Sequence, residues 1–192
     1  VSPVTLTIAS AGGSATLQVS SDISWTAASD QSWLTVNPAT GTGNGTVTLM
    51  ATANPLATPM ALRRDGRALP LEAAALASRL PDAGGRILVL IHGLCMSDLQ
   101  WLRAGHDHGA ALGQTLGYTP VYLHYNSGLH VSINGHALAQ QLERLVDQWP
   151  QPVERVALLG HSMGGLLARS AVHYGRQAGH RWPSRLTDMV FL

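Results

Sequence analysis

The chain has few of the features that would assign it to several protein classes. It contains a single cysteine, Cys95, so no internal disulfide can form and cysteine usage does not indicate a redox compartment. No apolar run reaches the ~18 residues of a membrane-spanning helix. No basic segment followed by a hydrophobic stretch, as in a secretory signal, opens the chain. Only 12% of its residues are charged and the net charge is +1, which gives no electrostatic reason to expect nucleic acid as a partner.

The few charges are distributed unevenly, and this divides the sequence in two. Residues 1–54 carry two Asp and neither Arg nor His, whereas residues 55–192 hold 12 Arg, nine His and nine acids. The first segment is rich in Ser, Thr, Val and Gly, and the second in Ala, Leu, Arg and His. Pro55 and Pro59 flank the change. We therefore expect a small domain at 1–54, a linker at 55–69 and a larger domain at 70–192.

Short runs of β-branched residues separated by turn signals predict strands in the first segment. Their regular spacing predicts an immunoglobulin-like sandwich. Trp25 and Trp33 fit either the sandwich core or an exposed platform for stacking sugars, and core is favoured because buried aromatics dominate small β cores. The predicted strands are "VTLTI" (4–8), "SATLQVS" (14–20), "ISWTAAS" (23–29), "WLTVN" (33–37) and "GTVTLMA" (45–51), with turns that include "NPATGTGNG" (37–45).

The string "SDISWTAASDQSWLTVNPATGTGNGTVTLMATANP" resembles the BACON family of β-sandwich modules over about residues 2–54. The resemblance implies a secreted or cell-surface protein whose β segment contacts glycan or mucin. The family continues with two more strands, whereas this chain turns to the helix-like, Ala-rich "LATPMALRRDGRALPLEAAALASRLP". We therefore expect the sandwich to lack its last strands and to leave a sheet edge unpaired.

The second segment alternates buried strands with amphipathic helices. "RILVLI" (86–91) is a continuous apolar run, as expected of a strand covered on both faces. Strand alternating with helix predicts an α/β fold, a parallel sheet with helices on both faces. Further strands are predicted at 119–125, 153–160 and 187–192, and helices at 107–116, 136–149 and 163–175.

One short motif lies where a strand gives way to a helix. Residues 160–164, Gly160-His161-Ser162-Met163-Gly164, fit G-x-S-x-G, in which the glycines permit a sharp turn and the serine Oγ is held above the sheet. The helix after the turn directs its first N–H groups toward developing negative charge. The alternative is an ordinary turn before a helix of small residues. The position between strand and helix favours a nucleophilic Ser162.

A second motif follows the upstream strand. His92 and Gly93 come directly after the apolar run, in "IHGLCMSDLQW" (91–101). In hydrolases with this turn, the loop after this strand supplies one oxyanion N–H and the residue after the serine supplies the other. These two donors are the amides of Leu94 and Met163, while His92, Gly93, Gly160, His161 and Gly164 shape the site.

With both motifs, residues from about 70 to 192 resemble the α/β-hydrolase superfamily, in particular bacterial esterases and lipases with an "HGL" loop and a "GHSMGG" elbow. The resemblance implies hydrolysis of a small-molecule or lipid ester through an acyl-serine at Ser162, with no metal or organic cofactor. In this superfamily the acid and the histidine follow the serine in the chain. His173, His180 and Asp188 follow Ser162, yet their predicted positions lie away from it, so we nominate none. We expect the acid and base outside this sequence, and little turnover without them.

Other polar clusters have plain structural interpretations. His106-Asp107-His108 is better explained by a helix cap than by a metal site, because no further spaced ligands accompany it. Cys95 is expected to be a small packed thiol. His124 and His130 border a loop that either lines an acyl pocket or lies on the surface, and the surface is favoured.

Two alternatives to a serine esterase remain open. In the first, the β segment binds glycan and the α/β part is an inactive remnant. In the second, the chain is a fragment or fusion without a function of its own, as the abrupt change of composition at 54–56 suggests.

Overall fold

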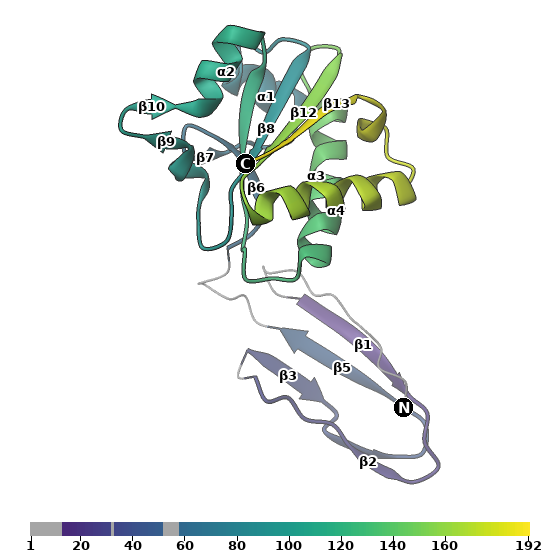
Figure 1. The fold of residues 1–192 in the computed structure, drawn as a ribbon. Coiled ribbons are helices and arrows are strands. Elements are labelled where there is room, and N and C mark those ends of the chain that lie inside the picture. Colours follow the sequence, from purple (N-terminus) through teal and green to yellow (C-terminus); the bar gives the residue numbers. More distant parts are fainter. Residues whose placement is uncertain (1–12, 32, 52–57) are drawn as a thin grey trace. The chain divides into compact units, whose positions relative to one another are not determined.

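The computed structural model describes residues 13–31, 33–51 and 58–192. The chain divides into two units, Val1–Thr58 and Pro59–Leu192 (Figure 1). The strand predicted at 4–8 lies outside the described residues.

The first unit contains two small antiparallel sheets. Three strands pair in the order β1 (Gly13–Val19), β5 (Gly45–Ala51) and β3 (Leu34–Asn37), while β2 (Ser24–Thr26) pairs with β4 (Thr40–Thr42). Four of these strands confirm predicted ones. The fifth, β4, lies in a stretch predicted as a turn, because its glycine-rich sequence hides a strand that forms only through pairing with β2.

The two tryptophans of this unit occupy different environments. Trp25 is half-buried and packs against the main chain, since a Cβ built on Gly41 would come within 2.1 Å of its ring. Its indole Nε1 donates to the carbonyl of Gly43 at 2.8 Å. Trp33 is 45% exposed, so the prediction that it belongs to the core is wrong.

A six-stranded mixed sheet forms the centre of the second unit. Four strands are parallel, as predicted, and β6 and β7 extend the sheet in antiparallel fashion. The sheet order is β13 (Leu186–Phe191), β12 (Arg155–Gly160), β8 (Arg86–Ile91), β11 (Thr119–His124), β6 (Ala61–Arg64) and β7 (Arg67–Ala68).

Strands β6 and β7 correct the predicted linker at 55–69. The sequence "ALRR" of β6 does not look like a sheet strand, because two arginines follow its one large apolar residue. In the structure Leu62 is 1% exposed, and the arginines bind partners on other segments. Arg63 pairs with Asp98 and Arg64 donates to the carbonyl of Pro120.

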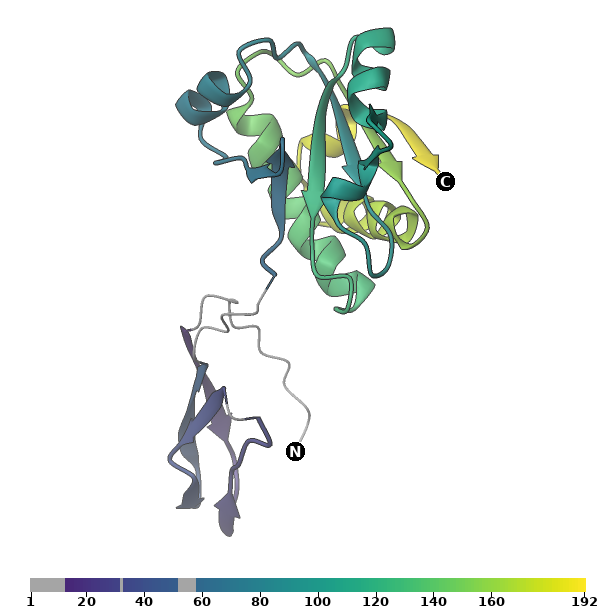
Figure 2. The ribbon, with the colours of Figure 1, turned by 90° about the vertical axis from the view of Figure 1, so that its left-hand side faces the viewer.

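Helices cover both faces of this sheet, as predicted (Figure 2). Odd-numbered residues of β8 pack toward α1, α3 and α4, and even-numbered ones pack with Trp101 and Leu112 on the other face. The helices are α1 (Ala73–Arg79), α2 (His108–Leu116), α3 (Val131–Gln148) and α4 (Met163–Gln177); the short elements are η1 (Asp98–Trp101), β9 (Leu102–Arg103), β10 (His106–Asp107) and η2 (Trp182–Ser184).

Helix α3 begins at Val131, five residues before the predicted start at 136. The sequence Asn134-Gly135 looks like a helix-start signal, but the helix runs through it. Gly135 is required there by packing, since a Cβ at this position would lie 2.1 Å from Ser170 Oγ on α4. Close approach of two helices therefore overrides the local preference of glycine.

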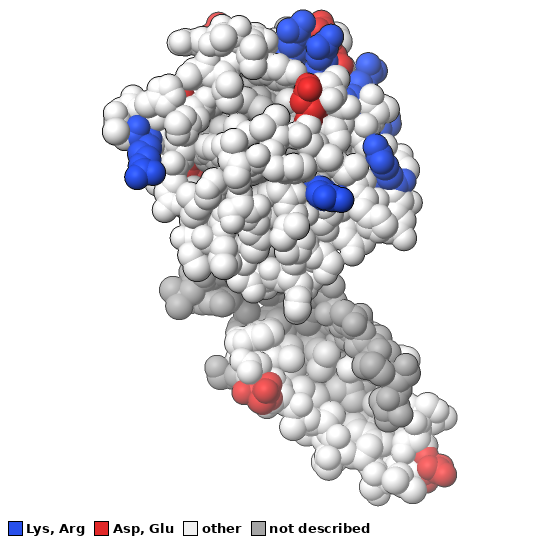
Figure 3. All heavy atoms as spheres, viewed as in Figure 1, with Lys and Arg blue, Asp and Glu red and all other residues white. Residues whose placement is uncertain are grey.

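Charged side chains are sparse on the face shown in Figure 3, which is mostly white. The first unit shows red and no blue, in keeping with Asp22 and Asp30 as its only charged residues. Within the described part of the chain, no helix is both long and apolar enough to cross a membrane.

Candidate active site

Ser162 lies at the turn between β12 and α4, as the motif predicts. Its backbone has φ 51° and ψ −120°, a conformation that L-residues adopt rarely and at a cost. It immediately precedes the first residue of α4, Met163. The strain is consistent with a turn that is held in place to present one side chain.

The glycines of the motif allow β12, α4 and β8 to approach one another closely. A Cβ on Gly160 would come within 2.6 Å of Gly165 N, on the first turn of α4. A Cβ on Gly164 would lie 2.3 Å from the carbonyl oxygen of Ile91, at the end of β8. Both clashes are with main chain, which cannot move aside, so no side chain fits at either position.

Backbone hydrogen bonds tie the turn to both neighbouring strands. His161 N donates to Ile91 O at 3.0 Å, and Ser162 N donates to Leu192 O at 2.8 Å. In return, Leu192 N donates to Gly160 O at 2.9 Å. The serine is therefore held between β8 and the residue that follows β13.

His92 is buried at the end of β8 and fixes the peptide that follows it. Its Nδ1 lies 2.9 Å from the carbonyl oxygen of Gly93, and since a carbonyl can only accept, Nδ1 carries the proton. Burial lowers the pKa of His92, which keeps the ring neutral. In a trans peptide the N–H points opposite to the C=O. Holding the Gly93 carbonyl therefore also sets the direction of the Leu94 N–H.

The amides predicted for the oxyanion hole are available. Among the described residues, neither Leu94 N nor Met163 N donates a hydrogen bond. Met163 is the first residue of α4, where backbone N–H groups have no intrahelical acceptor and the helix dipole is positive. Gly93 brings the Leu94 loop against the turn, because a Cβ there would lie 3.0 Å from His161 Nδ1.

Residues after β11 hold the loop that carries Leu94, and the sequence analysis missed them. Tyr125 Oη donates to the carbonyl of His92 at 2.8 Å, and burial raises the pKa of Tyr125 to about 12, so the donor stays protonated. Ser127 Oγ accepts from Cys95 N at 3.0 Å. The prediction of a packed Cys95 thiol is wrong: the residue is exposed and has φ 56°, because the loop turns outward there.

The polar residues after Ser162 lie away from it. His173 is eleven residues along α4, which places it ~16 Å up the helix axis at 1.5 Å per residue. His180 follows the far end of that helix, where its N donates to Gly175 O. Asp188 pairs in register with Ala157, three residues before the end of β12. We therefore assign neither base nor acid to these residues.

The remaining histidine clusters have structural partners. Asp107 caps α2 by accepting from Ala110 N at 2.9 Å and also accepts from Tyr122 Oη, which confirms the cap. The described residues contain no group of three or more His, Cys, Asp or Glu that could hold a metal ion. His124 is half-buried and bound to Asp98, and His130 is exposed.

A cleft of about 600 Å³ opens beside the turn, on the α2 side of the sheet. His92, at the end of β8, and His161, beside the serine, are among its lining residues. Most of its other walls are apolar side chains of the β8–α2 connection, α2 and the last strands, including Met96, Trp101, Leu112, Leu116, Leu159 and Val190.

Fold and turn together define a domain of the α/β-hydrolase type. Residues 82–181 match the family described as PGAP1-like alpha/beta domain, and the chain belongs to this family. Residues 1–60 match the viral BACON domain, which agrees with the resemblance of the first segment. The comparison with curated proteins gave no match.

Three solved structures show a distant likeness. The mature form of the Bacillus licheniformis lipase BlEst2 is 20% identical, with TM-score 0.44, over 55% of this chain and 39% of that one. Its propeptide form is 18% identical, with TM-score 0.44, over 69% and 25%. A Bacteroides ovatus GH5 xyloglucanase in complex with a XXXG heptasaccharide is 11% identical, with TM-score 0.28, over 95% and 52%. This chain thus spans less than half of either lipase structure, and at these scores the likeness carries no argument about activity.

Proposed function

We propose that the second unit is the nucleophile-bearing part of a serine ester hydrolase that acts on a small-molecule or lipid ester. The observation that supports this most is the strained Ser162 in the turn between Gly160 and Gly164. Neither Leu94 N nor Met163 N, on the segments beside it, donates a hydrogen bond among the described residues. An ordinary turn would have no need of strained non-glycine backbone at this position.

In the proposed reaction, Ser162 Oγ bonds to the ester carbonyl carbon while its proton passes to a base. The carbonyl oxygen becomes an oxyanion, which the amides of Leu94 and Met163 stabilise. Collapse of this intermediate breaks the C–O bond and releases the alcohol, which takes up a proton. Water then hydrolyses the acyl-serine and releases the carboxylic acid.

Covalent labelling tests the nucleophile through a single bond-forming step. This step also requires Ser162 to lose its proton, so without the base it should be slow, and it is measured over long incubation at alkaline pH with excess reagent. An alkyl fluorophosphonate should phosphonylate Ser162 with loss of fluoride, as detected by intact mass and peptide mapping. Ser162→Ala should abolish this labelling, whereas Ser170→Ala, on the helix that follows Ser162, should label like the parent. Labelling spread over several serines, or none at Ser162, would contradict the proposal.

Turnover of a chromogenic short-chain ester by this chain should stay close to that of Ser162→Ala. Serine hydrolases that lack triad members lose about 10⁴- to 10⁶-fold in kcat. Robust turnover that disappears in the variant would show that a histidine of this chain (His92, His124, His173 or His180) serves as the base, and the expectation that the base lies outside this sequence would be wrong.

A further inference from the structure

Asp98 holds the most completely buried carboxylate described in the second unit. Its side chain is 1% exposed, and its Oδ1 accepts from two groups on other segments. His124 Nδ1, at the end of β11, lies 2.8 Å away, and Arg63, on β6, lies 3.2 Å away. A buried carboxylate is strongly unfavourable unless it is paired, so these contacts fix the place of Asp98.

Asp98 follows directly after the segment that carries the Leu94 amide. The segment 93–97 leaves β8 at His92 and reaches η1 at Asp98. On one side Gly93 lies against His161, which comes from the β12 side of β8. On the other side Asp98 is bound to β11 and β6, which lie beyond β8 in the opposite direction. The segment is thereby held at both ends across the sheet.

We propose that Asp98 is a positioning residue that holds the Leu94 amide in place for oxyanion binding. This inference rests on the proposed function of Ser162. The negative charge itself is needed, because two donors share one oxygen while Asp98 Oδ2 and Arg63 Nε have no hydrogen-bond partner among the described residues. The cluster is therefore held more by charge than by a complete set of hydrogen bonds.

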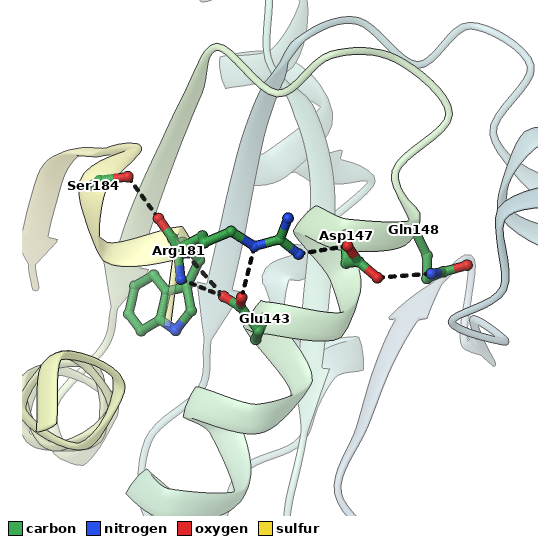
Figure 4. Close-up of polar contacts among 6 residues, drawn as sticks. Glu143, Asp147, Gln148, Arg181 and Ser184 are labelled. Atoms are coloured by element: carbon green, nitrogen blue, oxygen red, sulfur yellow. Dashed lines mark hydrogen bonds and ion pairs between the residues drawn. The ribbon is translucent and has the colours of Figure 1, made fainter. Parts of the chain in front are cut away.

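Asp98→Asn keeps an oxygen at this position and removes the charge. The matched control is Glu143→Gln, which removes a carboxylate that binds Arg181 and joins α3 to η2 on the other face of the sheet (Figure 4). Arg63→Gln is a milder second variant, because the arginine side chain is 27% exposed and less of the packing depends on it.

Two measurements separate a positioning role from a purely structural one. The first is fluorophosphonate labelling of Ser162, resolved into the affinity for the reagent (Ki) and the rate of bond formation (kinact). Asp98→Asn should lower kinact by about tenfold or more, which is less than the 10²–10³ lost with a whole oxyanion donor, and leave Ki nearly unchanged. Arg63→Gln should act in the same direction and less, and Glu143→Gln should leave both constants as in the parent.

The second measurement is amide hydrogen exchange, which does not depend on reactivity. Exchange in 93–97 should accelerate in Asp98→Asn and not in Glu143→Gln. Unchanged exchange in 93–97, or a kinact that falls equally in Asp98→Asn and Glu143→Gln, would overturn the inference. If Ser162 of the parent is not labelled at all while exchange in 93–97 still responds to Asp98→Asn alone, the proposed hydrolase function fails, and Asp98 orders the segment without an oxyanion role.

Discussion

The strands of the two units are buried in different ways. In β1 of the first unit, half-buried positions alternate with exposed ones over most of the strand, whereas β8 of the second unit has five consecutive buried residues. Alternation is typical of a strand with one covered face, and a continuous apolar run is typical of a strand covered on both. The strands at the centre of the second unit are therefore enclosed by the fold, whereas those of the first unit keep one face toward solvent.

Core size follows the same division. Among the described residues of the first unit, only Val47 and Ala51 are buried, while the second unit holds two large apolar clusters. A small unit buries a smaller fraction of its apolar surface, so it has less stability to lose. The catalytic candidates all lie on the unit with the larger core.

If the two units fold independently, limited proteolysis should cut first between them, and this is the largest effect that we expect. Pro55, Pro59 and the change in composition lead us to propose a boundary near 52–60. Brief digestion with thermolysin should cut there first and release a resistant fragment that begins near β6, as identified by mass spectrometry. Early cuts within β8 or α3, with 52–60 intact, would contradict two separate units.

The next largest effect should come from the core of the second unit. Leu142 on α3 is 0% exposed, so Leu142→Ala should destabilise this unit by about 2–5 kcal/mol. Val47→Ala, at a 1% exposed position of the first unit, is the counterpart and should cost less, since fewer carbon atoms are lost. Urea unfolding with separate probes for each unit measures both. A larger loss of unfolding free energy in Val47→Ala than in Leu142→Ala would contradict the view that the second unit has the larger core.

Gly164→Ala should cost about 1–3 kcal/mol, because its new methyl group would press on the carbonyl of Ile91. Gly84→Ala is the control, since a Cβ there meets nothing within 4 Å and its φ is not positive. Thermal unfolding of the two variants should separate them clearly. Equal melting temperatures would show that β8 and α4 can move apart at the turn.

The smallest effect should be the pH dependence of the Arg181 contacts (Figure 4). Hydrogen bonds from Arg181 and Gln148, and the charge of Arg181, lower the pKa of Asp147. Burial raises the pKa of Glu143, but hydrogen bonds from Trp182 N and Arg181 outweigh it, so that pKa is lowered as well.

Because both folded-state pKa values lie below the ordinary ones, these carboxylates contribute stability above the ordinary values of 4.5 and 3.8. This contribution to stability is lost as the pH falls through the pKa values of the folded state. Arg181→Gln should therefore lower the melting temperature slightly at neutral pH, and the difference should vanish in acid. A difference that grows in acid would contradict the sign. Arg181 and Asp147 are exposed and Glu143 is only half-buried, so the effect should be small.

The sequence by itself determined the elements whose residues are neighbours in the chain. Strand β8 was predicted with its observed bounds, because a short continuous run of apolar residues after Arg86 is typical of a strand covered on both faces of the sheet. The turn at Ser162 was predicted because its geometry depends on glycines within two residues of the serine. Helix α2 was predicted from a cap and a terminating glycine, Asp107 and Gly117, which act locally.

Only the tertiary structure decided the features that depend on residues far apart in the chain. In strand β6, Arg63 pairs with Asp98, which lies 35 positions later in the chain. Helix α3 continues through Gly135 because Ser170 of α4 packs against this glycine. The ties that hold the Leu94 segment, from Tyr125, Ser127 and His124, likewise join positions 26 to 33 residues apart. A local pattern reports the preference of a segment alone, whereas these contacts stabilise the fold only after the sheet has brought both partners together.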